Sequence, residues 1–168
     1  MRKDTVCVDL DGTLANIDHR VGLLQRSVPD WDGFYAGCVN DTPNEWCVAL
    51  MEAMIATGHD VIIVSARSRI VEVQTLQWLR DKTTLGRHLD SGKLRLCMLR
   101  GPIDYTPDTE LKRNWLNEFG RERILFVVDD RTKVVKEWRS LGLVCLQCAE
   151  WEEYKRPKKE KPNASTVA

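Results

Sequence analysis

Five short apolar runs separated by helix-type segments are the feature of this sequence that most restricts its fold. Each run is short and rich in Val, Ile and Leu, which is typical of a strand buried on both faces. The runs cover residues 5–10, 61–64, 94–99, 124–128 and 143–146. An alternation of such strands with helices predicts an α/β fold with a mainly parallel five-stranded sheet.

The helix-type segments carry recognisable start and stop signals. The Thr-Pro-Asn-Glu stretch at 42–45 predicts a capping box with Pro43 at the first helical position, and Gly58 predicts the end of that helix. A later helix is expected to open at Thr106-Pro107, and Thr132 is expected to cap another. The helix expected over residues 70–82 has three apolar positions on one face: Val73, Leu76 and Leu79.

The chain length of 168 residues suits one domain, which we expect to span residues 1–150. Residues 15–41 form a long insert after the first strand and predict a small cap over the sheet edge. Residues 152–168 are rich in Lys, Pro and small polar residues, which predicts a disordered basic tail.

The charge balance limits the possible partners. Lys plus Arg and Asp plus Glu both number 25, so the formal net charge is zero. This argues against a broad surface that wraps nucleic acid, although a local basic groove remains compatible with it. No apolar run is long enough for a membrane helix, and no secretory leader is recognisable, so we expect a cytoplasmic protein without a membrane partner.

The six cysteines are expected to be buried thiols in a reducing compartment. Cys145 and Cys148 form a C-x-x-C pair. Without a second pair at zinc-ribbon spacing, this pair is a weak sign of a metal or redox site.

Charged and polar side chains follow the predicted strands at the points where the strands end. The carboxyl ends of parallel strands meet at one edge of a sheet, so we expect these groups to converge there. They are Asp9, Asp11, Ser65, Asp129 and Asp130, with Lys112 in the helix before the fourth strand.

This combination of residue types predicts phosphoryl-transfer chemistry. Clustered carboxylates repel one another, and a hard divalent cation such as Mg²⁺ relieves the repulsion. Ser65 can donate to a phosphate oxygen, and Lys112 can neutralise phosphate charge. Asp9 is placed to attack phosphorus, and Asp11 is placed to serve as general acid and base, with Gly12 permitting the tight turn that this arrangement needs.

Other interpretations of the acidic motifs fit less well. An EF-hand counted from Asp9 needs Glu at its twelfth position, where this sequence has Arg20. A Walker A motif near Gly86 fails because five residues separate the glycines and Leu94 follows Lys93. A pair such as Asp129-Asp130 on its own is more often an acidic decoration of a helix N-terminus.

In order and position, these residues resemble the four motifs of the haloacid dehalogenase (HAD) superfamily of phosphohydrolases. The motifs are Asp9-Leu10-Asp11-Gly12-Thr13, Ser65, Lys112 and Asp129-Asp130. The resemblance implies a HAD-like Rossmannoid fold in three layers. It implies Asp9 as nucleophile, Asp11 as general acid/base, and a Mg²⁺ ion held by Asp9, the Asp11 backbone carbonyl, Asp129 and Asp130.

A narrower resemblance covers the end of the domain. Residues 129–135, followed by Trp138, Arg139, Gly142 and Cys145, are similar to the 3′-phosphatase domain of phage-type polynucleotide kinase/phosphatase. That family places basic substrate-binding residues where this chain has three arginines, which suit phosphate because of their planar fork. They are Arg20, Arg67 and Arg100.

The resemblance implies a Mg²⁺-dependent phosphomonoesterase that removes a 3′-phosphate from a DNA or RNA end, in the host cytoplasm if the gene is phage-encoded. No protein partner is implied. A phosphatase for free nucleoside monophosphates is the alternative, and zero net charge slightly favours it. A non-catalytic nucleic-acid-binding module is a remote alternative. Such a module is expected to have lost at least one charged motif residue, and this sequence retains all of them.

Overall fold

The computed structural model describes residues 4–149. Its main sheet has five strands in the order β5-β4-β1-β6-β7, and every neighbouring pair is parallel. The strands are β1 (Thr5–Val8), β4 (Asp60–Ser68), β5 (Leu94–Arg100), β6 (Ile124–Asp129) and β7 (Cys145–Gln147). The expected α/β fold with a parallel five-stranded sheet is therefore confirmed.

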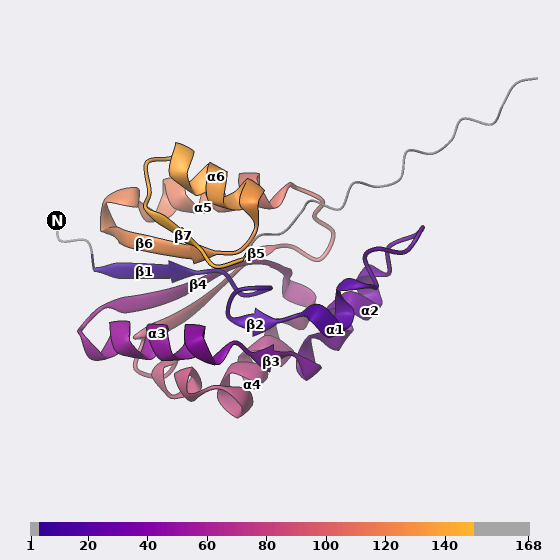
Figure 1. Ribbon diagram of the computed structural model, residues 1–168, viewed down its shortest axis with the longest axis horizontal. Helices are drawn as coiled ribbons and strands as arrows, with labels where there is room; N and C mark the ends of the chain where they lie inside the picture. Colours follow the sequence, from indigo (N-terminus) through magenta and orange to yellow (C-terminus); the bar gives the residue numbers. More distant parts are fainter. Residues whose placement is uncertain (1–3, 150–168) are drawn as a thin grey trace, which may run out of the picture.

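Helices cover both faces of this sheet and complete three layers (Figure 1). Helices α3 (Glu45–Ala56) and α4 (Glu72–Lys82) lie on one face, and α5 (Asp108–Phe119) and α6 (Thr132–Ser140) lie on the other. Short 3-10 helices cover Gly37–Asn40, Arg69–Val71, Thr84–His88 and Arg121–Arg123. None of the helices within residues 4–149 has the length and apolar character needed to cross a membrane.

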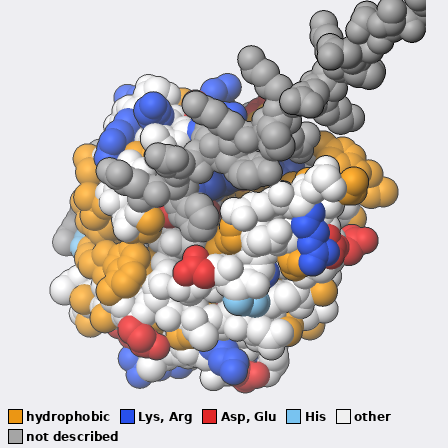
Figure 2. All heavy atoms as spheres, turned by 45° about the vertical axis from the view of Figure 1, so that its right-hand side comes forward, with side chains coloured by type: hydrophobic (Ala, Val, Ile, Leu, Met, Phe, Trp, Pro, Cys, Tyr) orange, Lys and Arg blue, Asp and Glu red, His pale blue; other side chains and the backbone are white. Residues whose placement is uncertain are grey.

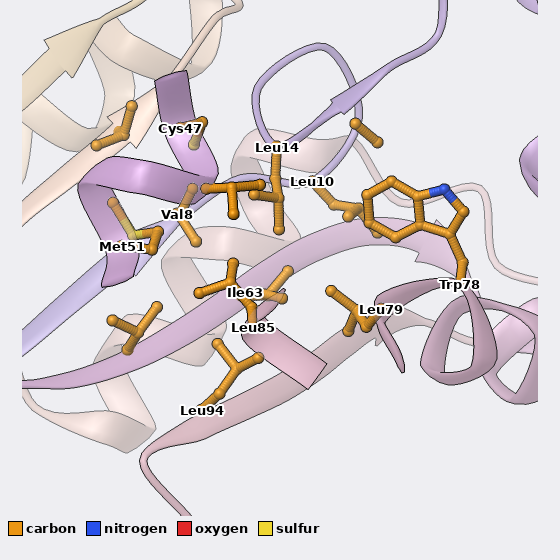
Figure 3. Close-up of a cluster of buried hydrophobic side chains, with 14 of the residues drawn as sticks. Val8, Leu10, Leu14, Cys47, Met51, Ile63, Trp78, Leu79, Leu85 and Leu94 are labelled. Atoms are coloured by element: carbon orange, nitrogen blue, oxygen red, sulfur yellow. The ribbon is translucent and has the colours of Figure 1, made fainter. Parts of the chain in front are cut away.

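The core is divided by the sheet into two clusters, because successive strand residues point to opposite faces. Val6 and Val8 of β1 join the cluster under α3 and α4, whereas Cys7 joins the cluster under α5 and α6. Figure 3 shows the first cluster, where Met51 and Trp78 from the two helices pack toward the sheet.

Residues 15–41 fold into short elements beyond the carboxyl end of β1 (Figure 1). Strand β2 (Ala15–Asn16) pairs in antiparallel fashion with β3 (Thr42–Pro43). Helices α1 (Asp18–Val21) and α2 (Trp31–Ala36) lie between these two strands in the sequence. The predicted basic tail at 152–168 lies outside the described residues.

The predicted capping box at residues 42–45 is wrong. Thr42 and Pro43 belong to β3, and α3 begins at Glu45. The side-chain amide of Asn44 donates to the Thr13 carbonyl at 2.8 Å. It therefore stabilises the turn after β1 instead of capping the helix. Similarly, Thr132 is the first residue of α6, and Arg131 occupies the N-cap position.

Two further expectations about individual elements need correction. Val73 was expected on the buried face of its helix, but it is 77% exposed, and the buried face carries Thr75, Trp78 and Leu79. Ser65 was expected just after a strand, but β4 continues through Ser68, so Ser65 lies within it.

Candidate active site

The parallel sheet brings the ends of its two central strands together. The Asp9 backbone amide donates to the Val128 carbonyl at 2.9 Å, which continues the pairing of β1 with β6 past the end of β1. Asp129 is the last residue of β6. Asp9, Asp129 and Asp130 each offer a carboxylate oxygen, and these three oxygens lie within 4.8 Å of one another. The predicted convergence of the first and fourth acidic motifs is therefore found.

Lys112 connects two of these carboxylates from helix α5. Its Nζ atom donates to Asp9 Oδ1 at 2.6 Å and to Asp129 Oδ2 at 2.7 Å. The indole nitrogen of Trp138 donates to the same Asp129 oxygen at 3.1 Å. Both Lys112 and Asp129 are buried, so the orientation of Asp129 is fixed by two donors in a site shielded from water.

The electrostatics of this cluster reflect its crowded negative charge. Burial raises the pKa of Asp9 well above its ordinary value, although the Lys112 charge opposes the change. Burial, together with the charge of Asp129, raises the pKa of Asp130 to about 6. Burial alone would lower the pKa of Lys112, but the charges of Asp129 and Asp9 raise it above its ordinary value, so the ammonium stays protonated.

The donor set of this cluster fits a hard divalent cation. Three carboxylates face one ammonium group, so the ionised cluster keeps a surplus of negative charge. Oxygen ligands of this kind suit Mg²⁺, which prefers carboxylates and water. The Thr13 hydroxyl donates to Asp130 Oδ1 at 3.2 Å and orients that carboxylate. A metal bound here would be held by Asp9, Asp129 and Asp130.

Asp11 lies beside this cluster and faces two arginines. Gly12 follows it with a φ of 87°, a left-handed conformation that favours glycine. Asp11 Oδ1 accepts from Arg20 Nη2 at 2.5 Å and from Arg67 Nη2 at 2.6 Å. Burial would raise the pKa of Asp11, but the charges and hydrogen bonds of Arg67 and Arg20 outweigh it and lower the pKa to about 2.

Asp41 is a member of this group that sequence reasoning missed. It is buried and accepts from Arg20 Nε at 2.6 Å and from Arg67 Nη2 at 2.9 Å. Two arginines and two aspartates thus form a charge-balanced group. No sequence signal marks Asp41, because it is the last residue of the insert and its arginine partners are 21 and 26 residues away.

The predicted phosphate-binding and substrate-binding residues from β4 lie next to each other. Ser65 is buried, and its Oγ accepts from the backbone amide of Arg67 at 3.1 Å. Arg67 Nη1 donates to the Thr75 hydroxyl of α4 at 3.1 Å. Both arginines of the Asp11 group are buried and hold protein carboxylates in this structure.

Arg100 belongs to a separate group. Its Nε donates to the Ala66 carbonyl at 2.9 Å and its guanidinium forms an ion pair with Asp108. Asp108 also pairs with Arg131. The Arg131 side chain is 45% exposed and that of Arg100 is 13% exposed, so Arg131 is the more accessible of the two.

These features together define a phosphatase of the HAD type. They are a parallel sheet with acids at the ends of adjacent strands, a buried lysine between these acids, and a second aspartate two residues after the first. Residues 3–152 match the family described as the polynucleotide kinase PNKP phosphatase domain, and the chain belongs to that family.

Solved structures share this fold. A chain from the Pnkp1/Rnl/Hen1 RNA repair complex is similar over 88% of this chain, with 26% identity and a TM-score of 0.68. A chain from a second Pnkp1/Rnl/Hen1 complex is similar over 89%, with 24% identity and a TM-score of 0.70. This chain spans 43% and 47% of the length of those two chains. A candidate phosphatase from Clostridium difficile shares the fold over 88% of this chain and 85% of its own, with 11% identity and a TM-score of 0.58.

Proposed function

We propose that this chain removes the phosphate from the 3′ end of DNA or RNA in a Mg²⁺-dependent reaction. The observation that carries the proposal is the buried cluster in which Lys112 lies 2.6 Å from Asp9 and 2.7 Å from Asp129. The family consists of the phosphatase domains of polynucleotide kinases, and this supports a polynucleotide end as the substrate.

In this proposal Mg²⁺ would be held by Asp9, the backbone carbonyl of Asp11, Asp129 and Asp130. When bound, the ion supplies charge stabilisation to the phosphoryl group. Lys112 adds a second positive charge at the same point, and its two hydrogen bonds keep Asp9 and Asp129 in fixed orientations. Ser65 donates a hydrogen bond to a phosphate oxygen.

Asp9 acts as the nucleophile. One of its carboxylate oxygens attacks phosphorus, the bond between phosphorus and the 3′ oxygen of the nucleic acid breaks, and an aspartyl phosphate forms. The departing oxygen takes a proton from Asp11. Help of this kind from a positioned acid is worth about 10²–10⁴-fold in rate.

Asp11 then acts as the base. A water molecule gives its proton to Asp11 and attacks phosphorus, and the bond between phosphorus and Asp9 breaks to release inorganic phosphate. In the free site the arginines lower the pKa of Asp11 to about 2, which favours its ionised form. A bound phosphate dianion would raise that pKa by like-charge repulsion and by sharing the positive charge of Arg20 and Arg67. The two arginines thereby bind substrate and adjust Asp11, and Arg100 is proposed as a third substrate-binding residue.

A phosphatase for free nucleoside monophosphates is the second candidate. Figure 2 shows acidic, basic and apolar side chains interspersed on one face of the molecule, without one extended basic field on the described part of that face. A short substrate needs no such field, whereas a long nucleic acid gains affinity from one.

One comparison of substrates tests the proposal. Rates of phosphate release are measured with 3′-phosphorylated oligonucleotides, 5′-phosphorylated oligonucleotides, and free 3′- and 5′-mononucleotides, with Mg²⁺ and with EDTA. We expect 3′-phosphorylated oligonucleotides to be the best substrates, and we expect EDTA to abolish release. Asp9→Asn serves as the control and should lower kcat by about 10³-fold or more, because it removes the nucleophile. Faster turnover of mononucleotides would favour the second candidate.

A further inference from the structure

Helix α2 in the insert carries three aromatic side chains that all contact one another. The ring centroids of Trp31 and Tyr35 are 5.9 Å apart with planes inclined at 31°. Phe34 meets Trp31 at 6.0 Å and Tyr35 at 5.7 Å, in edge-on arrangements. Phe34 is buried, whereas Trp31 is 49% exposed and Tyr35 is half-buried. The buried ring thus supports two rings that remain accessible.

Arg20 connects this aromatic group to Asp11. Its guanidinium carbon lies 4.2 Å from the centroid of the Phe34 ring, and Nη1 donates to the Phe34 carbonyl at 3.2 Å. The same guanidinium donates to Asp11 at 2.5 Å. The position of α2 relative to Asp11 is therefore set by one buried side chain with an ion pair, a hydrogen bond and a ring contact.

Tyr35 also lies close to the charged groups of the site. Burial raises the pKa of its hydroxyl, and the charges of Arg100, Asp108 and Asp11 act on that hydroxyl. These residues belong to both of the arginine groups described above. The Tyr35 ring packs partly against the core under α3 and α4, and its hydroxyl lies near the charged groups of the site.

We propose that Trp31 and Tyr35 form a stacking platform for the base of the terminal nucleotide that carries the phosphate. This inference rests on the proposed function. Aromatic rings stack on any base because every base has a π-face, so the platform would bind nucleic acid ends regardless of their sequence. Because Arg20 holds α2 in place, the platform is preorganised. Little conformational entropy is therefore lost when the base binds.

A second exposed tryptophan offers a matched control. Trp46 in α3 is 48% exposed, nearly the same as Trp31. It lines a cavity of about 380 Å³ together with Gly12, Asn44 and Cys148, and Trp31 and Tyr35 are not among the residues that line it. A base that bound in this cavity would contact Trp46 and not Trp31.

The experiment compares two 3′-phosphorylated oligonucleotides that differ only in their terminal nucleotide, which is either normal or abasic. The value of kcat/KM is measured for each oligonucleotide with the wild type, Trp31→Ala, Tyr35→Ala, Trp31→Phe, Tyr35→Phe and Trp46→Ala. The ratio of the two values within one variant cancels any general effect of the substitution on folding or chemistry.

We expect the wild type to prefer the base-bearing end by roughly 10-fold, as stacking on an aromatic ring provides. Trp31→Ala and Tyr35→Ala should bring the ratio near one, mainly by raising KM for the base-bearing end. Both phenylalanine variants and Trp46→Ala should keep most of the preference.

An equal preference in the wild type and the two alanine variants would overturn the inference. So would loss of the preference in Trp46→Ala with Trp31→Ala unaffected. If neither oligonucleotide is hydrolysed while p-nitrophenyl phosphate still is, the proposed function fails and the inference fails with it. That result differs from an active 3′-phosphatase that ignores the base.

Discussion

Lys112 and Asp9 are 103 residues apart in the sequence, yet the lysine Nζ lies 2.6 Å from the aspartate Oδ1. The same ammonium group lies 2.7 Å from Asp129 Oδ2. Lys112 is therefore the cation that forms ion pairs with the buried carboxylates of Asp9 and Asp129. The contribution of Lys112 to the free energy of unfolding should therefore depend on whether a divalent cation is also bound to these carboxylates.

Lys112→Met should destabilise the metal-free protein strongly and the Mg²⁺-bound protein less. Removing one partner of a buried charge pair costs about 3–5 kcal/mol, because the other charge remains buried without compensation. Urea unfolding with EDTA and with Mg²⁺ measures the difference. Lys93→Met is the matched control, since Lys93 pairs with Asp60 at 2.8 Å but is half exposed, and exposed pairs contribute about 0–1 kcal/mol. The same loss of stability in both conditions would argue against a metal site at these carboxylates.

Asp41→Asn should lower kcat by about 10²-fold and also raise KM, because Asp41 holds the two arginines that orient Asp11 and are proposed to bind substrate. Kinetics with p-nitrophenyl phosphate and urea unfolding, measured on the same sample, separate a loss of positioning from a loss of folding. Asp32→Asn, at an exposed position of α2, is the control and should behave as wild type. An unchanged kcat in folded Asp41→Asn would show that Asp11 is positioned without it.

Asp11→Asn should slow substrates with poor leaving groups more than an activated aryl phosphate. An alkoxide leaving group needs the proton that Asp11 supplies, whereas p-nitrophenolate leaves without one. The measurement is the ratio of kcat values on a 3′-phosphorylated oligonucleotide and on p-nitrophenyl phosphate. Equal slowing of both substrates would remove Asp11 from the role of general acid.

The metal-free protein should become more stable as the pH falls from 7 to 5. The pKa of Asp130 is raised in the folded protein to about 6 from an ordinary value of 3.8, so the folded state binds a proton more readily than the unfolded state. Its stability therefore increases as pH falls through 6 and decreases as pH rises through 6. We expect a rise in Tm of roughly 5 °C with EDTA.

Mg²⁺ should abolish this pH dependence, since a bound cation keeps the carboxylates ionised in the folded state. Thermal unfolding at pH 5, 6 and 7, with EDTA and with Mg²⁺, measures both effects. Asp130→Asn should show a smaller pH dependence without metal. A Tm that stays flat or falls toward pH 5 in EDTA would contradict the electrostatic account of the cluster.

The sequence predicted the sheet well where strands are buried on both faces. The runs that became β1 and β6 are continuous and apolar, as central parallel strands are. The end of β4 was missed because Ser65 and Ser68 are polar residues within a strand. The buried face of α4 was misplaced because contact with the insert sets it, as the Trp78 indole donates to the Asp41 carbonyl at 2.7 Å.

The site was predictable only where its residues follow central strands or match the motifs of the superfamily. Asp9 and Asp129 met both conditions, and the structure places them together with Lys112. Asp41 met neither condition. Its partner Arg20 comes from the insert, where short helices without a hydrophobic period give no register from which a contact across 21 residues can be inferred.

The central position of β1 has a consequence for how this chain acquires its activity. Strand β1 is synthesised before both of its partners and pairs with β4 and with β6, whose partner residues begin at Asp60 and Ile124. Loops this long must close before β1 has two neighbouring strands, and this makes folding slow. A nascent chain also lacks its acid cluster until β6 has been translated. A truncated product that stops after β5 would retain the nucleophile, yet it would lack Lys112 and Asp129 and would therefore be inert toward phosphate esters.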